Sequence, residues 1–184
     1  MIPGRHSVNS KRLQRGATLL EAMIAMGVLL VGAAGLIGLQ RQTMLFMADS
    51  RQATRAACFA QDLASQIELW DYADTRLANT NTANDADPTA GMETDVGSSS
   101  WVTPDHSDAE IPDTDPNWTG LKSDMLVANG MERYWNVSSG DDLNANGVAD
   151  ALRVAIIVRW RPGGARSWRY ATFFVVKPNP ADML

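Results

Sequence analysis

The chain has 184 residues, of which 45% are hydrophobic and 20% charged, so it has room for one modest folded domain and is not disordered throughout. Its formal net charge is −5, but the first 16 residues carry four bases and no acid, whereas the remainder carries twelve bases and 21 acids. This acidic surplus argues against a nucleic-acid-binding surface.

The chain contains one cysteine, Cys58, and two histidines, His6 and His106. A single cysteine forms no disulfide within the chain, so packing alone must hold the domain together. The three side chains do not make a zinc-type cluster. No nucleophile–base pair or phosphate-binding loop is recognised either, so we expect a protein that is not an enzyme and needs no resident cofactor.

Residues 17–39 form an apolar run in which the only charged residue is Glu21. A helix of 23 residues rises about 34 Å at about 1.5 Å per residue, which is enough to cross the hydrocarbon core of a bilayer. Lys11, Arg12 and Arg15 precede the run, and the acidic bulk follows it. By the positive-inside rule, we expect a cytoplasmic N-terminus and a domain on the other side of the membrane.

The segment from Arg15 to Glu21 reads RGATLLE, a basic residue and a glycine followed by the start of the apolar run. It resembles the class III signal of type IV pilins and of type II secretion pseudopilins. The resemblance implies that a prepilin peptidase cuts between Gly16 and Ala17 and methylates the new N-terminus at Ala17, where the family usually has phenylalanine. It also implies that Glu21 is the acid kept within the membrane for assembly. An ordinary anchor would instead let Glu21 reach the membrane interface.

The stretch VGAAGLIGLQ, residues 31–40, resembles the VGxxGLxxLQ pattern of the PilV subfamily of minor pilins, the type IV pilus modification proteins. This likeness implies a single-pass protein of the inner membrane with a periplasmic domain, which becomes extracellular in the assembled pilus. It implies the major pilin, other minor pilins and a pilus tip adhesin as partners. Two alternatives remain: a minor pseudopilin of a type II secretion system, and a single-span anchored binding module.

Beyond residue 39 the helical pattern continues without proline or glycine, so we expect one helix from about Ala17 to Leu69. Its second half, residues 40–72, is amphipathic. The apolar stripe recurs at gaps of three and four and comprises Leu45, Ala48, Gln52, Ala56, Phe59, Leu63, Ile67 and Trp70.

An acidic segment follows, and we expect it to form a long loop over residues 73–125 with little contribution to the core. Residues 71–115 hold eleven acids and one base, Arg76. Trp101 and Trp118 are expected to pin the loop to the domain.

The C-terminal part, residues 126–184, is expected to be an antiparallel sheet. Strands are predicted loosely at Arg133–Val137 and strongly at Leu152–Trp160 and Trp168–Val176, with a turn at Arg161–Arg166 between the last two. A long helix followed by strands predicts an α+β domain, the fold of type IV pilins, with the sheet packed on the helix stripe.

The loop before the strong strand places side-chain oxygens at Asp142, Asn144, Asn146 and Asp150, with Gly147 between them. This spacing matches the first half of a calcium-binding loop, but Arg153 stands where the closing glutamate would be. The same residues suit an Asn-Gly hairpin turn, which we favour over a Ca²⁺ site.

Overall fold

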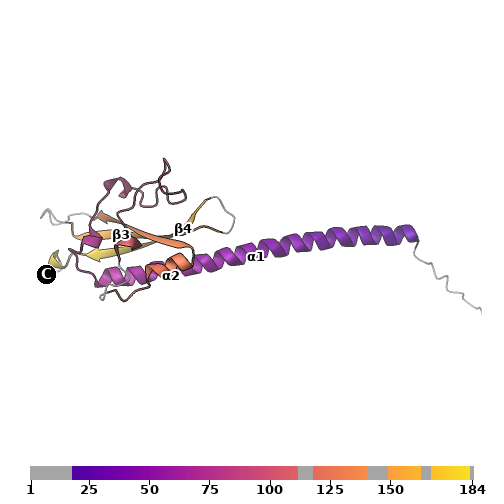
Figure 1. Ribbon diagram of the computed structural model, residues 1–184, viewed down its shortest axis with the longest axis horizontal. Helices are drawn as coiled ribbons and strands as arrows, with labels where there is room; N and C mark the ends of the chain where they lie inside the picture. Colours follow the sequence, from indigo (N-terminus) through magenta and orange to yellow (C-terminus); the bar gives the residue numbers. More distant parts are fainter. Residues whose placement is uncertain (1–17, 112–117, 141–148, 163–166, 183–184) are drawn as a thin grey trace, which may run out of the picture. The chain divides into compact units, whose positions relative to one another are not determined.

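The computed structural model describes residues 18–111, 118–140, 149–162 and 167–182. The chain divides into two compact units, Met1–Phe46 and Met47–Leu184. Helix α1 (Leu19–Leu69) runs through the boundary, as the continuous apolar and amphipathic pattern predicts (Figure 1). We describe each unit by itself.

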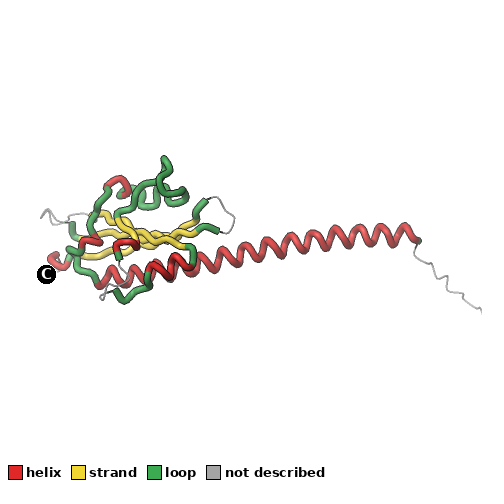
Figure 2. Tube along the Cα trace, viewed as in Figure 1, coloured by secondary structure: helices red, strands yellow, loops and turns green. Residues whose placement is uncertain are grey.

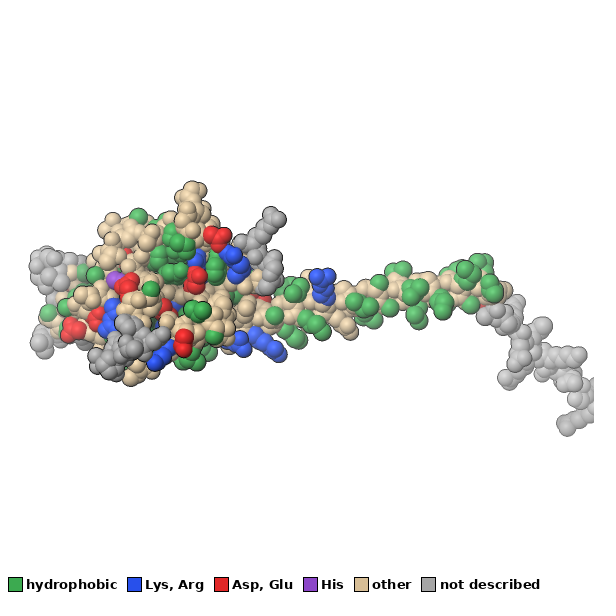
Figure 3. Space-filling model, in the orientation of Figure 1, with side chains coloured by type: hydrophobic (Ala, Val, Ile, Leu, Met, Phe, Trp, Pro, Cys, Tyr) green, Lys and Arg blue, Asp and Glu red, His purple; other side chains and the backbone are tan. Residues whose placement is uncertain are grey.

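In the first unit, every residue from Thr18 to Phe46 is exposed. Figure 3 shows hydrophobic side chains on this part of α1. In the described part of the chain, α1 is the one helix long and apolar enough to cross a membrane. Exposed apolar surface of this extent requires lipid or other helices to cover it.

In the second unit, a four-stranded antiparallel sheet lies between α1 and the loop segments that follow α1 in sequence (Figures 1 and 2). The strand order is β1-β2-β3-β4. Among the described residues, the elements after α1 are β1 (His106–Ser107), α2 (Ser123–Ala128), β2 (Met131–Ser139), β3 (Ala151–Trp160) and β4 (Arg169–Pro178). Single-turn 3₁₀ helices lie at Thr75–Leu77, Thr82–Asn84, Asp108–Glu110 and Pro180–Asp182. The expected α+β class, a long N-terminal helix with a C-terminal antiparallel sheet, is confirmed.

The core forms between the α1 stripe and alternate residues of the strands. On the sheet, the register pairs Trp135 with Ile156 and Val137 with Val154, and all four are buried. On α1, the stripe residues Ala56, Phe59, Leu63 and Ile67 are buried with them.

The acidic segment departs from expectation because it contributes to this core. Leu77, Ile111 and Trp118 are buried in it, and Met92 is buried outside this cluster. Each of these apolar residues stands alone among polar ones, so no periodic pattern reveals that it turns inward. The two-residue strand β1 and the six-residue helix α2 were also not expected, because both are too short to show a period.

The C-terminal end of α1 is closed by a side chain from the sheet. The Lys177 ammonium donates to the carbonyl oxygens of Ile67, at 3.0 Å, and Glu68, at 3.2 Å. These carbonyls have no partner within the helix, and a cation there is favourable to the helix dipole. Lys177 thus joins the last turn of α1 to the end of β4.

Candidate functional site

The described part of the N-terminal motif begins at Thr18, and the predicted cleavage and methylation residues, Gly16 and Ala17, lie outside it. The Thr18 hydroxyl accepts a hydrogen bond from the Glu21 backbone N–H at 3.3 Å, and the Thr18 carbonyl accepts from Ala22 N–H at 3.1 Å. Thr18 therefore caps α1, and Glu21 lies in its first turn, where a carboxylate is favourable to the helix dipole. Glu21 is exposed, so its carboxylate is accessible to a cation from another molecule.

The predicted calcium loop lies mostly outside the described residues, because Asp142, Asn144 and Asn146 are not among them. Asp150, just before β3, accepts a hydrogen bond from Asn179 N–H on its backbone carbonyl at 2.8 Å. Within the described ranges, no group of three or more His, Cys, Asp or Glu side chains is placed to hold a metal ion. Calcium binding therefore stays a prediction.

The segment after α1 is held to the sheet by a buried carboxylate. Asp105 accepts hydrogen bonds from the backbone N–H groups of Thr80, Asn81 and Val137, at 2.8, 2.6 and 2.7 Å. Two of these donors belong to the start of the loop and the third to β2. One carboxylate thus connects the start of the loop to β2, and its burial makes these charge-assisted bonds strong.

His106 forms a second anchor next to Asp105. Its Nε2 lies 2.7 Å from the Ala78 carbonyl oxygen, and its Nδ1 lies 2.6 Å from a Glu110 carboxylate oxygen. A carbonyl only accepts, so Nε2 is the donor in the first contact, and Nδ1 faces the Glu110 carboxylate in the second. The ring stacks on Trp135 with centroids 5.5 Å apart.

A cluster around Arg159 holds the tip of the loop on the outer face of the sheet, the face opposite α1. The guanidinium is 1% exposed and lies over the rings of Trp101, at 4.5 Å, and Trp168, at 4.3 Å. It donates to Glu132 at 2.7 Å and to the Thr94 carbonyl at 3.0 Å. Stacking and paired hydrogen bonds together compensate a fully buried charge. The expectation that Trp101 pins the loop is confirmed.

Two groups of the Arg159 cluster have shifted pKa values. Burial raises the pKa of the Tyr134 hydroxyl to about 12, and its hydrogen bond to Glu132 acts in the same direction. At the exposed edge, hydrogen bonds from the Trp168 indole and from Arg161 lower the pKa of Asp95.

Arg133 on β2 is the buried arginine on the opposite face of the sheet, the face that packs against α1. It is 2% exposed and donates to Asp108 at 2.7 Å, to the Phe59 carbonyl at 2.9 Å and to the Leu121 carbonyl at 3.2 Å. The expectation for Trp118 is confirmed as well, because this ring packs on Trp70 and lies beneath the Arg133 guanidinium.

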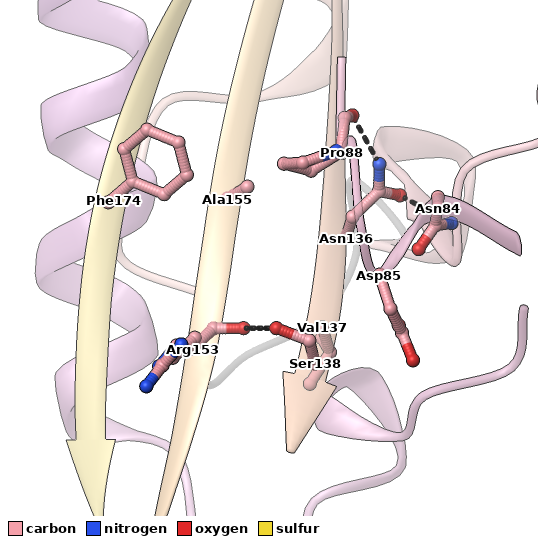
Figure 4. A pocket seen from close by; sticks show the side chains of 9 residues that line it. All are labelled: Asn84, Asp85, Pro88, Asn136, Val137, Ser138, Arg153, Ala155 and Phe174. Carbon is pink, nitrogen blue, oxygen red and sulfur yellow. Dashed lines mark hydrogen bonds between the residues drawn. The ribbon is translucent and has the colours of Figure 1, made fainter. Parts of the chain in front are cut away.

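A cavity of about 170 Å³ opens on the outer face of the sheet. Figure 4 shows its floor at Ala155 on β3, with Phe174 of β4 and Asn136 of β2 on either side and Pro88 from the loop. Asn136 donates to the Pro88 carbonyl at 2.6 Å and accepts from Asn84 at 3.2 Å. The cavity is smaller than ordinary ligand pockets, and its hydrogen bonds serve to attach the loop.

Sequence reasoning did not identify Asp105, Arg133 or Arg159 as organising residues. Arg159 lies between Val158 and Trp160, within a run of β-branched and aromatic residues. This position in the sequence could have indicated that its side chain is buried. A buried arginine requires paired acceptors, so its presence in a core strand indicates a covered face.

Residues 11–37 match the family model described as the prokaryotic N-terminal methylation motif. No curated protein and no solved structure matches the chain. The matched motif and the α+β fold are type IV pilin-like.

Proposed function

We propose that the chain is a minor pilin, a structural subunit of a type IV pilus that acts in pilus assembly, priming or the tip complex and so in adhesion and twitching motility. The observation that carries the proposal is the methylation motif over residues 11–37, most of which lies in the exposed apolar part of α1. The VGxxGLxxLQ likeness supports the PilV subfamily.

The proposal assigns a role to each residue of the motif. A prepilin peptidase cuts after Gly16 and methylates Ala17, and the exposed Glu21 carboxylate then pairs with the N-terminal ammonium of a neighbouring subunit within the membrane. A charge within the bilayer needs a partner, so the pairing guides the subunit into the filament. The partners are the prepilin peptidase, the major pilin, other minor pilins and a tip adhesin.

The closest competing function is that of a type II secretion pseudopilin, which has the same motif and fold. A deletion strain separates the two. Loss of twitching motility with normal exoprotein secretion supports the pilus, and the reverse pattern assigns the chain to secretion.

The first experiment is mass spectrometry of the N-terminus of the protein isolated from its own membranes. We expect a chain that begins at N-methylated Ala17. A chain that still carries Arg15 and Gly16 in cells with an active peptidase would overturn the proposal and favour a single-span anchored binding module.

A further inference from the structure

Strand β4 is the last strand of the sheet, and no described residue pairs with its outer edge. It is ten residues long, so its free backbone N–H and C=O groups form a row that can template another strand. Proteins normally protect such an edge with charges, proline, a bulge or a short length. The opposite edge, β1, is only two residues long.

The centre of β4 carries none of these protections. Residues 170–176 read YATFFVV and contain no charge, proline or glycine. The flanking cations do not protect the edge, because Arg169 pairs with Asp49 and Lys177 donates to a carbonyl at the C-terminal end of α1. An exposed segment of this composition is an aggregation hazard unless another chain covers it.

The side chains of β4 indicate what kind of segment covers the edge. Ala171 and Val175 pack against the core, so the alternate residues lie on the outer face. There Phe174 is 71% exposed and Val176 64% exposed, with Tyr170 further along the same row. Figure 4 shows Phe174 on this open face of β4. A strand added here would be favoured by apolar residues at alternate positions that meet this row.

A second copy of the chain does not fit the edge. Antiparallel pairing of two β4 strands reverses the direction in which α1 enters the domain, although both chains enter the same membrane from the same side. Parallel pairing of two β4 strands brings the outer row of one sheet beside the α1-covered face of the other. Pairing of β4 with β1 of another copy uses only two residues.

We propose that β4 is a docking edge to which an extended segment of a different protein, with apolar residues at alternate positions, adds as a fifth strand. Backbone hydrogen bonds along β4 supply affinity, and Tyr170, Phe174 and Val176 supply the side-chain contacts. The inference goes beyond the proposed function, because neither cleavage after Gly16 nor pairing at Glu21 implies a partner at this edge.

The test places the photo-crosslinker p-benzoylphenylalanine at position 174 of the full chain in its native membranes. The matched control carries it at Val127, which is 74% exposed on α2. We expect the probe at position 174, but not at 127, to join one peptide of another protein with the alternating apolar pattern. An adduct with β4 of a second copy, with lipid or with no protein would overturn the proposal.

Two further measurements separate strand addition from simple proximity. Val176→Lys in the chain with the probe at position 174 is expected to lower the adduct yield about tenfold, whereas Val127→Lys leaves it unchanged. Hydrogen exchange of the unsubstituted chain is expected to be slower at residues 170–176 in membranes than after purification in detergent. Equal exchange in the two states would contradict a fifth strand even if Val176→Lys failed to fold.

Discussion

Two buried arginines on neighbouring strands hold α1 on one face of the sheet and the loop on the other. Arg133 on β2 fixes α1 and the segment around Leu121, and Arg159 on β3 fixes the loop through Thr94 and Trp101. Removal of a buried charge from its partners is costly because the acceptors are left without a donor. Each guanidinium is therefore expected to be more sensitive to substitution than exposed arginines of the same chain.

Substitution of Arg159 by lysine should test this view. Lysine keeps the charge but loses the planar group that stacks on Trp101 and Trp168 and the fork that reaches both Glu132 and Thr94. We expect a loss of about 2 kcal/mol in the free energy of unfolding, measured by urea denaturation in detergent with tryptophan fluorescence. Arg161→Lys is the control, because its side chain is 40% exposed, and should cost under about 1 kcal/mol. Equal losses of stability in the two variants would contradict a special role for the Arg159 guanidinium.

Tyr134 should make the stability of the domain fall at alkaline pH. Its pKa in the folded state is about 12, above the ordinary value of 10.0, so the folded state holds the phenol proton more tightly than the unfolded state. The stabilisation is fully present below about pH 10 and is lost as the pH rises towards about 12. Absorbance titration should show one late tyrosinate step that Tyr134→Phe removes. A late step that persists in Tyr134→Phe would contradict this assignment.

At the scale of elements, α1 depends on a cap from another element. The structure gives its first turn an acid, Glu21, but no basic residue in its last turn. Lys177 supplies that charge from β4, across about 110 residues of sequence. The end of the helix therefore depends on a formed sheet.

Replacement of Lys177 by methionine should loosen this junction. The substitution keeps much of the apolar stem but removes the ammonium, and we expect a loss of about 1 kcal/mol. Hydrogen exchange should accelerate in the last turn of α1, at residues 66–69. Arg51→Met, an exposed substitution on the same helix, serves as the control. Unchanged exchange at residues 66–69 would show that the helix end does not depend on Lys177.

The loop that contains Asp142 and Asp150 gives a prediction about metal. Because we favour a hairpin turn, the melting temperature should be the same in calcium and in chelator. A bound ion at 100 times its dissociation constant would add about 2.7 kcal/mol, which a thermal melt would readily detect. A rise that Asp142→Ala removes would establish the calcium site instead.

The sequence predicted the elements whose hydrophobic pattern repeats. The α1 stripe and the β3–β4 pair could be recognised because Phe59, Leu63 and Ile67 recur at helical gaps and residues 154–158 are consistently apolar. The loop could not be read this way. Leu77 and Met92 are isolated, and contacts such as that of Arg159 with Thr94 depend on strand register and on a chain separation of 65 residues. Such contacts become apparent only in three dimensions.

At the scale of the whole molecule, the role that we propose for Glu21 is to link one chain to the assembly. Glu21→Val should leave membrane insertion and cleavage after Gly16 intact, because an apolar residue suits the bilayer, but should abolish entry into the filament. Sheared pili and membranes can be compared by immunoblot. Glu68→Gln, at the exposed far end of the same helix, should enter filaments normally. Normal incorporation of Glu21→Val would refute the pairing.

Asp105, His106 and Arg159 anchor the loop, but the turn at Gly97 takes no part in these contacts. Gly97 is exposed, has a φ of +85°, and an added Cβ there would meet no atom within 4 Å. Contacts of Asp95 and Trp101 hold the chain on both sides of this turn. We therefore expect a short epitope inserted at Gly97 to leave the rest of the loop in place. The turn is thus a position for a fluorescent label that would report on the molecule in living cells without touching α1, the sheet or the β4 edge.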